Sequence, residues 1–250
     1  MAPAVAFDDR GRGEPVVLVH AFPLDRRMWQ PVVAELSTAR FITPDIRGFG
    51  AAPLGAPWSV DDAADDLAAL LDRLHLPRAT LGGLSMGGYI AMAFARRHPD
   101  RLAGLILADT RMGADTAEAR AGRDRAIAQI ADRGVHSYVE EFVPKLAVTA
   151  KAREYALAIA TLQTPTAIAA ALAALRDRPD AAEGLAVLRV PVLVMVGAKD
   201  ELTPPAEAQK ITAAVPGAQY VEIPEAGHLA CLDAPGAFAH AIKNFMRSCG

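Results

Sequence analysis

Short apolar runs rich in β-branched residues alternate along this chain with stretches whose apolar residues recur at helical spacing, and this alternation constrains the fold most. The runs expected to form strands cover residues 16–19, 40–45, 79–82, 102–108, 190–196 and 219–223. The stretches expected to form helices cover residues 25–36, 60–74, 86–97, 204–215 and 235–246. Strands that alternate with helices are typical of a parallel sheet covered on both faces. The sequence therefore predicts an α/β fold.

One long segment interrupts the alternation. From Arg111 to about Leu185 the chain is rich in alanine, helical in its pattern and without an obvious strand. Breaks between its helices are expected at Gly134, Pro144, Thr149, Pro165 and Pro179. A separate helical domain is the alternative, but about 75 residues of short helices would struggle to be stable alone. We therefore expect residues 111–185 to form a helical cap inserted into an α/β core of residues 1–110 and 186–250.

The composition excludes several classes of protein. A length of 250 residues, with 52% hydrophobic and 22% charged residues, fits one globular domain with a modest insertion. A net charge of -3 leaves no excess of cations for a nucleic-acid backbone or an anionic membrane, so neither partner is expected. No apolar run approaches the ~20 residues of a spanning helix, and the first residues do not resemble a secretory signal. The chain has only two cysteines, Cys231 and Cys249, so no disulfide framework is expected and we expect a cytoplasmic protein.

A glycine-flanked serine follows the third expected strand and opens a helix. The sequence Gly83-Leu84-Ser85-Met86-Gly87 in this context is typical of a nucleophile elbow. A sharp strand-to-helix turn strains the backbone of the nucleophile, and the glycines let neighbouring chain pass without a Cβ collision. A chance glycine-rich turn is the alternative, and the position between strand and helix disfavours it. A phosphate-binding loop is disfavoured because no Lys-Ser or Lys-Thr pair follows.

A serine hydroxyl needs a base near neutrality, and six histidines compete for that role. Only His228 falls in a loop between the last strand and the last helix, next to Gly227. The acid should follow a strand and lie between the serine and the histidine in chain order. Asp200 meets both conditions, and Asp109, which also ends a strand, is its rival. Glu201 and Glu225 are weaker candidates.

Two backbone N–H groups are expected to bind the oxyanion of the tetrahedral intermediate. The first belongs to Met86, directly after the serine, and the second to Phe22, in the loop after the first strand. Pro23 cannot donate a hydrogen bond, and it biases Phe22 toward an extended backbone that directs its N–H inward. Each such donor is worth ~3 kcal/mol of transition-state stabilisation.

Together these segments resemble the α/β-hydrolase superfamily. The resemblance rests on His20-Ala21-Phe22, on residues 45–50 and 83–88, on Gly197-Ala198-Lys199-Asp200 and on Gly227-His228, and it covers essentially the whole chain. The chain most resembles small bacterial esterases and 3-oxoadipate enol-lactonases. The resemblance implies a mostly parallel eight-stranded sheet with helices on both faces, a helical lid after the sixth strand, and no cofactor; we assign no metal ligands. Many relatives have His-Gly where this chain has His20-Ala21, which narrows the pocket beside the donor.

The residue at the elbow separates related activities. Dehalogenases and epoxide hydrolases of similar layout carry an aspartate there, so Ser85 disfavours both. We expect a hydrolase that cleaves a small carboxylic ester or lactone through an acyl-enzyme on Ser85. Two alternatives stay open. One is a cofactor-free perhydrolase or haloperoxidase, which a peracid assay distinguishes, and the other is a slow-turnover ligand receptor with a retained triad, which multiple-turnover kinetics distinguishes. Nothing in the pattern indicates an oligomeric state.

Overall fold

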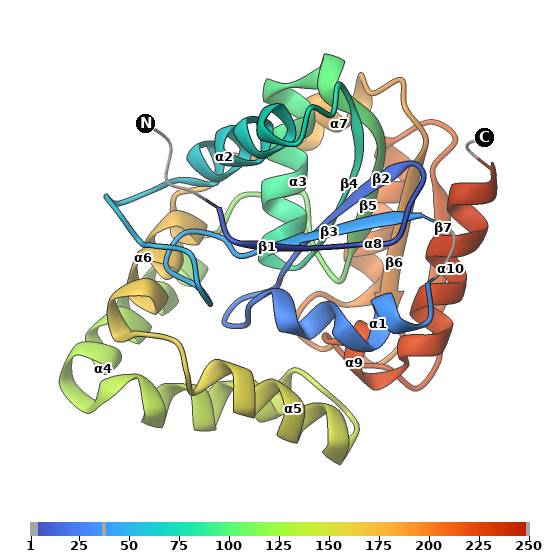
Figure 1. Ribbon diagram of the computed structural model, residues 1–250. Coiled ribbons are helices and arrows are strands. Elements are labelled where there is room, and N and C mark those ends of the chain that lie inside the picture. Colours follow the sequence, from blue (N-terminus) through green and yellow to red (C-terminus); the bar gives the residue numbers. More distant parts are fainter. Residues whose placement is uncertain (1–4, 37–38, 249–250) are drawn as a thin grey trace.

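A seven-stranded sheet lies at the centre of the computed structural model, which describes residues 5–36 and 39–248. The strand order is β1-β3-β2-β4-β5-β6-β7 (Figure 1). Strand β1 runs antiparallel to β3, and all other neighbours are parallel. The strands are β1 (Phe7–Arg10), β2 (Pro15–Val19), β3 (Arg40–Pro44), β4 (Ala79–Leu84), β5 (Leu102–Ala108), β6 (Val192–Gly197) and β7 (Gln219–Ile223).

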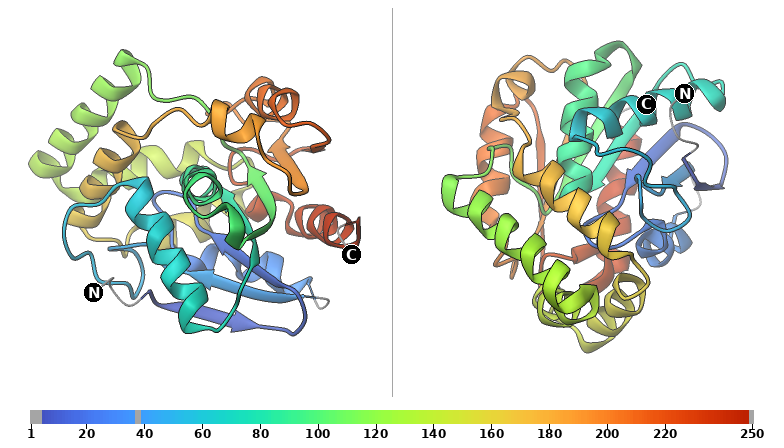
Figure 2. Two further views of the ribbon diagram at one scale, coloured as in Figure 1. Left: turned by 90° about the horizontal axis from the view of Figure 1, so that it is seen from above. Right: turned by 90° about the vertical axis from the view of Figure 1, so that its left-hand side faces the viewer.

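Helices cover both faces of the sheet, as the alternation predicts (Figures 1 and 2). One face carries α1 (Gln30–Ala34), α9 (Ala230–Asp233) and α10 (Pro235–Ser248), which contact one another. The other face carries α2 (Val60–Arg73), α3 (Met86–Arg97) and α8 (Pro205–Ala214). Two 3-10 helices, η1 (Arg26–Trp29) and η2 (Pro99–Arg101), complete the core. Because helices pack on both sides, every residue of β4 and β6 is buried, which explains their continuous apolar sequences.

The resemblance implies eight strands, and this count is wrong for the described residues, which form seven. The sheet ends at β1, whose sequence Phe-Asp-Asp-Arg presents charged side chains at the edge. Asp8 pairs there with Arg26, and Asp9 pairs with Arg40. Charged residues on an edge strand disfavour the addition of another strand. The helical segment accordingly follows the fifth strand of this sheet, not the sixth.

Four α-helices and a 3-10 helix separate β5 from β6. They are α4 (Ala117–Phe142), η3 (Val143–Lys145), α5 (Ala150–Ala160), α6 (Pro165–Arg176) and α7 (Ala182–Ala186). The predicted breaks are confirmed. Gly134 bends α4 with a φ of 81°, Thr149 caps the N-terminus of α5, and Pro165 opens α6.

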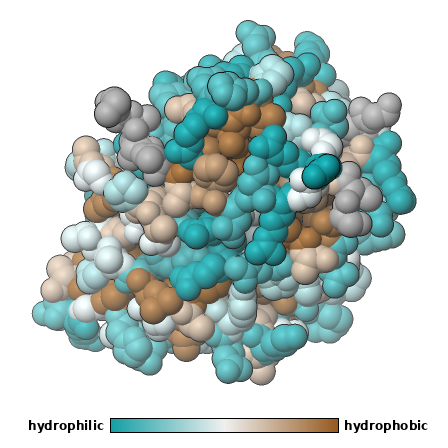
Figure 3. Space-filling view, in the orientation of Figure 1, coloured by the Kyte–Doolittle hydropathy of each residue, from teal (hydrophilic) through white to brown (hydrophobic). Residues whose placement is uncertain are grey.

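The helices of this segment do not all pack in the same place. Helices α4 and α6 pack on each other beside the sheet, whereas α7 packs on α3 and α8 (Figures 1 and 2). Hydrophobic patches on the face shown in Figure 3, one of them over α4 to α6, are separated by hydrophilic side chains. No single helix in the described ranges is long and apolar enough to cross a membrane; α5 and α6 reach that length only as a pair bent by 107°.

Candidate active site

Ser85 occupies the turn between β4 and α3 in a backbone conformation that few residues adopt. Its φ is 55° and its ψ is -111°, outside the regions favoured for a residue with a side chain. Two hydrogen bonds hold it there: its N–H donates to the Ala108 carbonyl at 3.0 Å, and the Thr110 hydroxyl donates to its carbonyl at 3.0 Å. Strain of this kind persists only where the surroundings fix it, and it clusters at functional sites.

The glycines on either side of the serine have a steric role. A Cβ on Gly83 would lie 2.1 Å from the carbonyl carbon of Gly87, and a Cβ on Gly87 would lie 2.1 Å from the Val19 carbonyl oxygen. No side chain fits at either place, because the helix starts against the end of β4 and against β2. The two positions therefore require glycine for the turn to form.

Asp200 and His228 meet in the core beside this turn. Asp200 follows β6 and His228 follows β7, and Oδ2 of Asp200 lies 2.9 Å from Nδ1 of His228. Both side chains are buried. Burial alone would raise the pKa of Asp200, but the hydrogen bonds and charge it receives from His228, together with Thr203, hold that pKa below its ordinary value. Asp200 is therefore an anion that holds Nδ1–H of His228.

The other ring nitrogen of His228, Nε2, is buried and has no hydrogen-bond partner among the described residues. It has no hydrogen bond to Ser85 in this structure, although both side chains line the same cavity. Catalytic hydrogen bonds are often long in ligand-free sites and shorten with substrate. A buried, unpartnered ring nitrogen beside a strained serine is suited to accept a proton from it.

Thr203 also contacts Asp200, and the sequence analysis did not identify it. Its hydroxyl donates to Oδ2 of Asp200 at 2.6 Å and lies 3.1 Å from Nδ1 of His228. Its backbone N–H donates to Oδ1 of Asp200 at 2.9 Å. A threonine three residues after an aspartate in a loop is the signal that could have identified it, because such side chains hydrogen-bond locally.

Asp109, the rival acid, lies at the end of the neighbouring strand β5 and serves a different contact. Its Oδ1 accepts a hydrogen bond from the Gly197 N–H at 2.8 Å, and its Oδ2 has no partner in the described part of the chain. It makes no hydrogen bond to His228. Burial, reinforced by the nearby charge of Asp200, raises the pKa of Asp109 well above its ordinary value. Burial therefore favours the protonated form of Asp109, whose contact with the Gly197 N–H joins β5 to β6.

The remaining candidates lie elsewhere. His20 is fully buried, accepts a hydrogen bond on Nε2 from the Ile46 N–H at 3.0 Å, and faces the Ala21 carbonyl through Nδ1 at 3.0 Å. Burial lowers the pKa of His20, so it is a neutral residue that holds the loop leading to Phe22. Glu201 is exposed, and Glu225 pairs with Lys199 at the surface.

The two expected oxyanion donors flank the serine from different elements. Met86 is the first residue of α3, and Phe22 lies in the loop after β2, where its peptide bond to Pro23 is cis. Neither N–H donates to a carbonyl elsewhere in the described chain. The N–H of Ala21, one residue earlier, is directed away to the sulfur of Met28 at 3.1 Å. Two N–H groups are thus left for a ligand.

A cavity of about 300 Å³ is lined by Phe22, Ser85 and His228. Its floor includes Ser85 and His228, and its aromatic wall consists of Phe22 with Tyr138 and Phe142 from α4. The Tyr138 and Phe142 rings stack with their centroids 5.5 Å apart, and burial raises the pKa of Tyr138 to about 12. The rest of the lining comes from the β5–α4 loop, from α3, α4 and α6, and from the loop that carries Asp200: Tyr89, Arg111, Asp115, Ala119, Gly122, Arg123, Ala126, Leu172, Leu175, Leu202 and Thr203.

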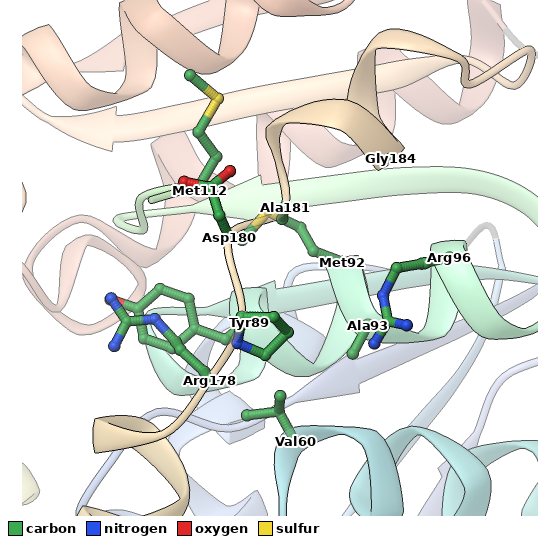
Figure 4. A pocket seen from close by; sticks show the side chains of 11 residues that line it. Val60, Tyr89, Met92, Ala93, Arg96, Met112, Arg178, Asp180, Ala181 and Gly184 are labelled. Carbon is green, nitrogen blue, oxygen red and sulfur yellow. The ribbon is translucent and has the colours of Figure 1, made fainter. Parts of the chain in front are cut away.

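A second, much smaller cavity of about 20 Å³ lies behind Tyr89. Figure 4 shows the Arg178 guanidinium against the Tyr89 ring, with 4.1 Å from the guanidinium carbon to the ring centroid. Tyr89 lines both cavities, and Arg178 stands between the small cavity and Asp115. No three histidine, cysteine or carboxylate side chains within the described ranges are grouped to hold a metal ion.

The comparisons with known proteins agree with this architecture. The chain is 32% identical to 3-oxoadipate enol-lactonase 2 of Acinetobacter baylyi, over 88% of this chain and 84% of that protein. It is 30% identical to a protein of Mycobacterium tuberculosis provisionally named a non-heme bromoperoxidase, with 98% of both chains covered. Among solved structures, a thermophilic esterase from Thermogutta terrifontis with malate bound has a TM-score of 0.94 and 40% identity, covering 98% of this chain and 93% of that one. The model of the alpha/beta hydrolase family matches residues 16–241, and the chain therefore belongs to the alpha/beta hydrolase family.

Proposed function

We propose that this hydrolase cleaves a small carboxylic ester or lactone through an acyl-enzyme on Ser85. The observation that carries the proposal is the buried, unpartnered Nε2 of His228, which shares one cavity with the strained Ser85. Asp200 contacts the opposite ring nitrogen at 2.9 Å, which leaves Nε2 as the nitrogen that accepts a proton. The esterase and enol-lactonase among the related proteins support the same chemistry.

The reaction divides into two halves with the same machinery. In the first half, Oγ of Ser85 attacks the carbonyl carbon while Nε2 of His228 takes its proton. The N–H groups of Phe22 and Met86 stabilise the resulting oxyanion, and His228 then gives its proton to the leaving alcohol. In the second half, His228 takes a proton from water, the hydroxide attacks the acyl-enzyme, and Ser85 regains its proton as the acid leaves. For a lactone, alcohol and acid are parts of one product.

Residues 111–185 act as the cap in this proposal. The support is positional: α4 and α6 pack on each other and both contribute to the cavity wall over the catalytic residues. The cap closes the site from water and limits the size of the bound acyl group. The boundary near residue 185 is a proposal too, because α7 packs on α3 and α8 rather than on α4.

Hydrolysis of p-nitrophenyl butyrate tests the proposal. We expect multiple turnovers by the unchanged chain and a fall of kcat on the order of 10⁴-fold in Ser85→Ala and in His228→Gln, because the triad acts as a unit. His136→Gln is the matched control, since His136 is an exposed histidine on α4. A fall of less than about tenfold in Ser85→Ala would place the nucleophile elsewhere.

A second activity has its own support in the provisionally named bromoperoxidase relative. A cofactor-free perhydrolase uses the same acyl-enzyme, but hydrogen peroxide replaces water as the attacking nucleophile. The acyl group then leaves as a peracid, Ser85 regains its proton, and the peracid oxidises bromide in solution. Peracid formation from acetate and hydrogen peroxide, compared between the unchanged chain and Ser85→Ala, distinguishes this activity from hydrolysis alone.

The partners and the cellular location of the enzyme are part of the same proposal. We expect a small-molecule substrate and no nucleic-acid or membrane partner. A cytoplasmic location is proposed on the low cysteine content, two residues in 250, and fractionation of the source cells tests it.

A further inference from the structure

Positive charge exceeds negative charge around the catalytic cavity. Two arginines, Arg111 and Arg123, line it, and Asp115 is the one acidic side chain in the described lining. Asp200 does not line the cavity, and its carboxylate contacts the ring of His228 rather than either arginine. A neutral short ester would leave this excess of cationic groups without a counterpart.

Asp115 does not neutralise the excess, because two guanidinium groups already share its carboxylate. Arg123 donates to Oδ2 at 2.5 Å, and Arg178 donates to Oδ1 at 2.6 Å. These contacts hold the pKa of Asp115 below its ordinary value against the opposing effect of burial, so it stays ionised. One carboxylate between two arginines leaves one positive charge over, and Arg111 adds a second.

Arg111 has no acidic partner in the described chain. It donates through Nη2 to the Leu202 carbonyl at 2.5 Å, while its Nε is buried without any acceptor. A cation that lines the cavity without a carboxylate partner leaves its charge uncompensated, and the guanidinium has further N–H donors besides the one on Leu202. The Leu202 contact also locates the guanidinium, because Leu202 and Thr203 lie on the loop that positions His228.

We propose that the substrate of this site carries a carboxylate in addition to its ester or lactone carbonyl, and that Arg111, with Arg123, binds it. This inference rests on the hydrolase function proposed above. Planar guanidinium groups match the geometry of a carboxylate and form paired, charge-assisted hydrogen bonds with it. In a partly buried cavity such a pair is screened less than at the surface. Arg111 and Arg123 are then specificity-determining residues, and Arg178 positions Asp115 and Arg123 from behind.

The test compares matched ester pairs that differ by one carboxylate. On the acyl side, mono-p-nitrophenyl glutarate is compared with p-nitrophenyl pentanoate. On the alcohol side, 4-(carboxymethyl)phenyl acetate is compared with 4-ethylphenyl acetate. Each kcat/KM is divided by the rate of hydrolysis without enzyme, because a carboxylate changes the intrinsic reactivity of an ester. We expect the corrected ratio to favour the carboxylate in at least one pair by about tenfold or more, and to fall as salt is added.

Variants separate the two arginines from general surface charge. Arg111→Gln and Arg123→Gln should each lower the corrected ratio by about tenfold, as expected for loss of a charge-assisted contact, and Arg111→Lys should retain part of it. Arg125→Gln is the matched control, because Arg125 is exposed on the same helix as Arg123 and lies outside the cavity lining. It should leave the ratio unchanged. Binding provides a test that does not depend on turnover. The affinities for glutarate and for neutral glutaramide are compared in Ser85→Ala and in Ser85→Ala combined with Arg111→Gln.

The outcomes are distinguishable. Hydrolysis of the neutral esters with no preference for a carboxylate in either pair would overturn this inference and leave the hydrolase proposal standing. A preference that survives Arg111→Gln and Arg123→Gln would also overturn it. Failure to hydrolyse any of the four esters, together with equal binding of glutarate and glutaramide by Ser85→Ala, would overturn both.

Discussion

Oδ2 of Asp200 lies 2.9 Å from Nδ1 of His228, while Asp109, at the end of the adjacent strand, makes no hydrogen bond to that histidine. This difference predicts which of the two acids matters more for turnover. Asp200→Asn should lower kcat by on the order of 10⁴-fold, because an amide no longer fixes the correct tautomer of His228 or stabilises its imidazolium. Asp109→Asn should lower kcat far less. Steady-state kinetics of both variants, corrected for folded protein, gives the ranking, and the reverse order would move the catalytic acid to β5.

Asp109 should instead control the pH dependence of stability. Its pKa is raised in the folded chain by burial. Below the ordinary aspartate pKa of about 3.9, both folded and unfolded chains carry the proton, and the full stability is present. As pH rises, the unfolded chain loses the proton first, so stability falls by up to about 1.4 kcal/mol per pH unit until the folded pKa is reached.

Asp109→Asn carries no titrating proton at this position, so it serves as the reference variant for the pH dependence of stability. The free energy of unfolding of the unchanged chain minus that of Asp109→Asn should decrease as pH is raised from 4.5 to 8. Urea unfolding of both chains at several pH values measures it. A difference that stays constant across this range would contradict the raised pKa of Asp109.

Thr203 should act as a positioning residue through Asp200. Its hydroxyl helps to lower the pKa of Asp200, so Thr203→Val should make that carboxylate more basic and move the acidic limb of the kcat/KM profile to higher pH. We expect kcat to fall with little change in KM, because Asp200 and His228 act on the transition state. Thr203→Ser retains the hydroxyl and should restore the profile. If Thr203→Val lowers stability but leaves the pH profile unmoved, its role is only structural.

Some parts of the site were predictable from the sequence, and others were not. The turn at Ser85 was predictable because its requirements are local: Gly83 and Gly87 stand where a Cβ would collide with passing backbone. Chain order and strand ends led to Asp200 and His228, and their contact in the structure agrees with that reasoning. Their catalytic roles stay predictions, as does the role of the Phe22 and Met86 N–H groups.

Other features depend on contacts that no local pattern encodes. Arg111 contacts the Leu202 carbonyl on a separate loop, and an isolated arginine carries no signal of that contact. Thr203 differs, because its position three residues after Asp200 is a local signal. The strand β1 was missed because Phe7–Arg10 is short and charged, as an edge strand is. The short helix α9 was missed for a similar reason, since four residues give no periodicity. The number of strands came from resemblance alone, and it was wrong by one for the described residues.

The cavity predicts a preference for short acyl groups. A volume of about 300 Å³, enclosed partly by α4 and α6, leaves little room for a long chain. We expect a higher kcat/KM for p-nitrophenyl butyrate than for p-nitrophenyl palmitate, with no activation by emulsified lipid. Rates above and below the aggregation threshold of the palmitate ester measure this. A preference for palmitate, or a sharp rise at that threshold, would show that α4 and α6 part to expose a longer groove.

The central claim is that Ser85 is the covalent nucleophile, and intact-protein mass spectrometry after reaction with a fluorophosphonate tests it most directly. The account predicts one adduct per chain, located in the peptide that contains Gly83 to Gly88, and no adduct on Ser85→Ala. Ser137→Ala, which removes a serine of α4 outside the cavity lining, should label like the unchanged chain. An adduct that persists in Ser85→Ala, or that maps to another peptide, would contradict the account.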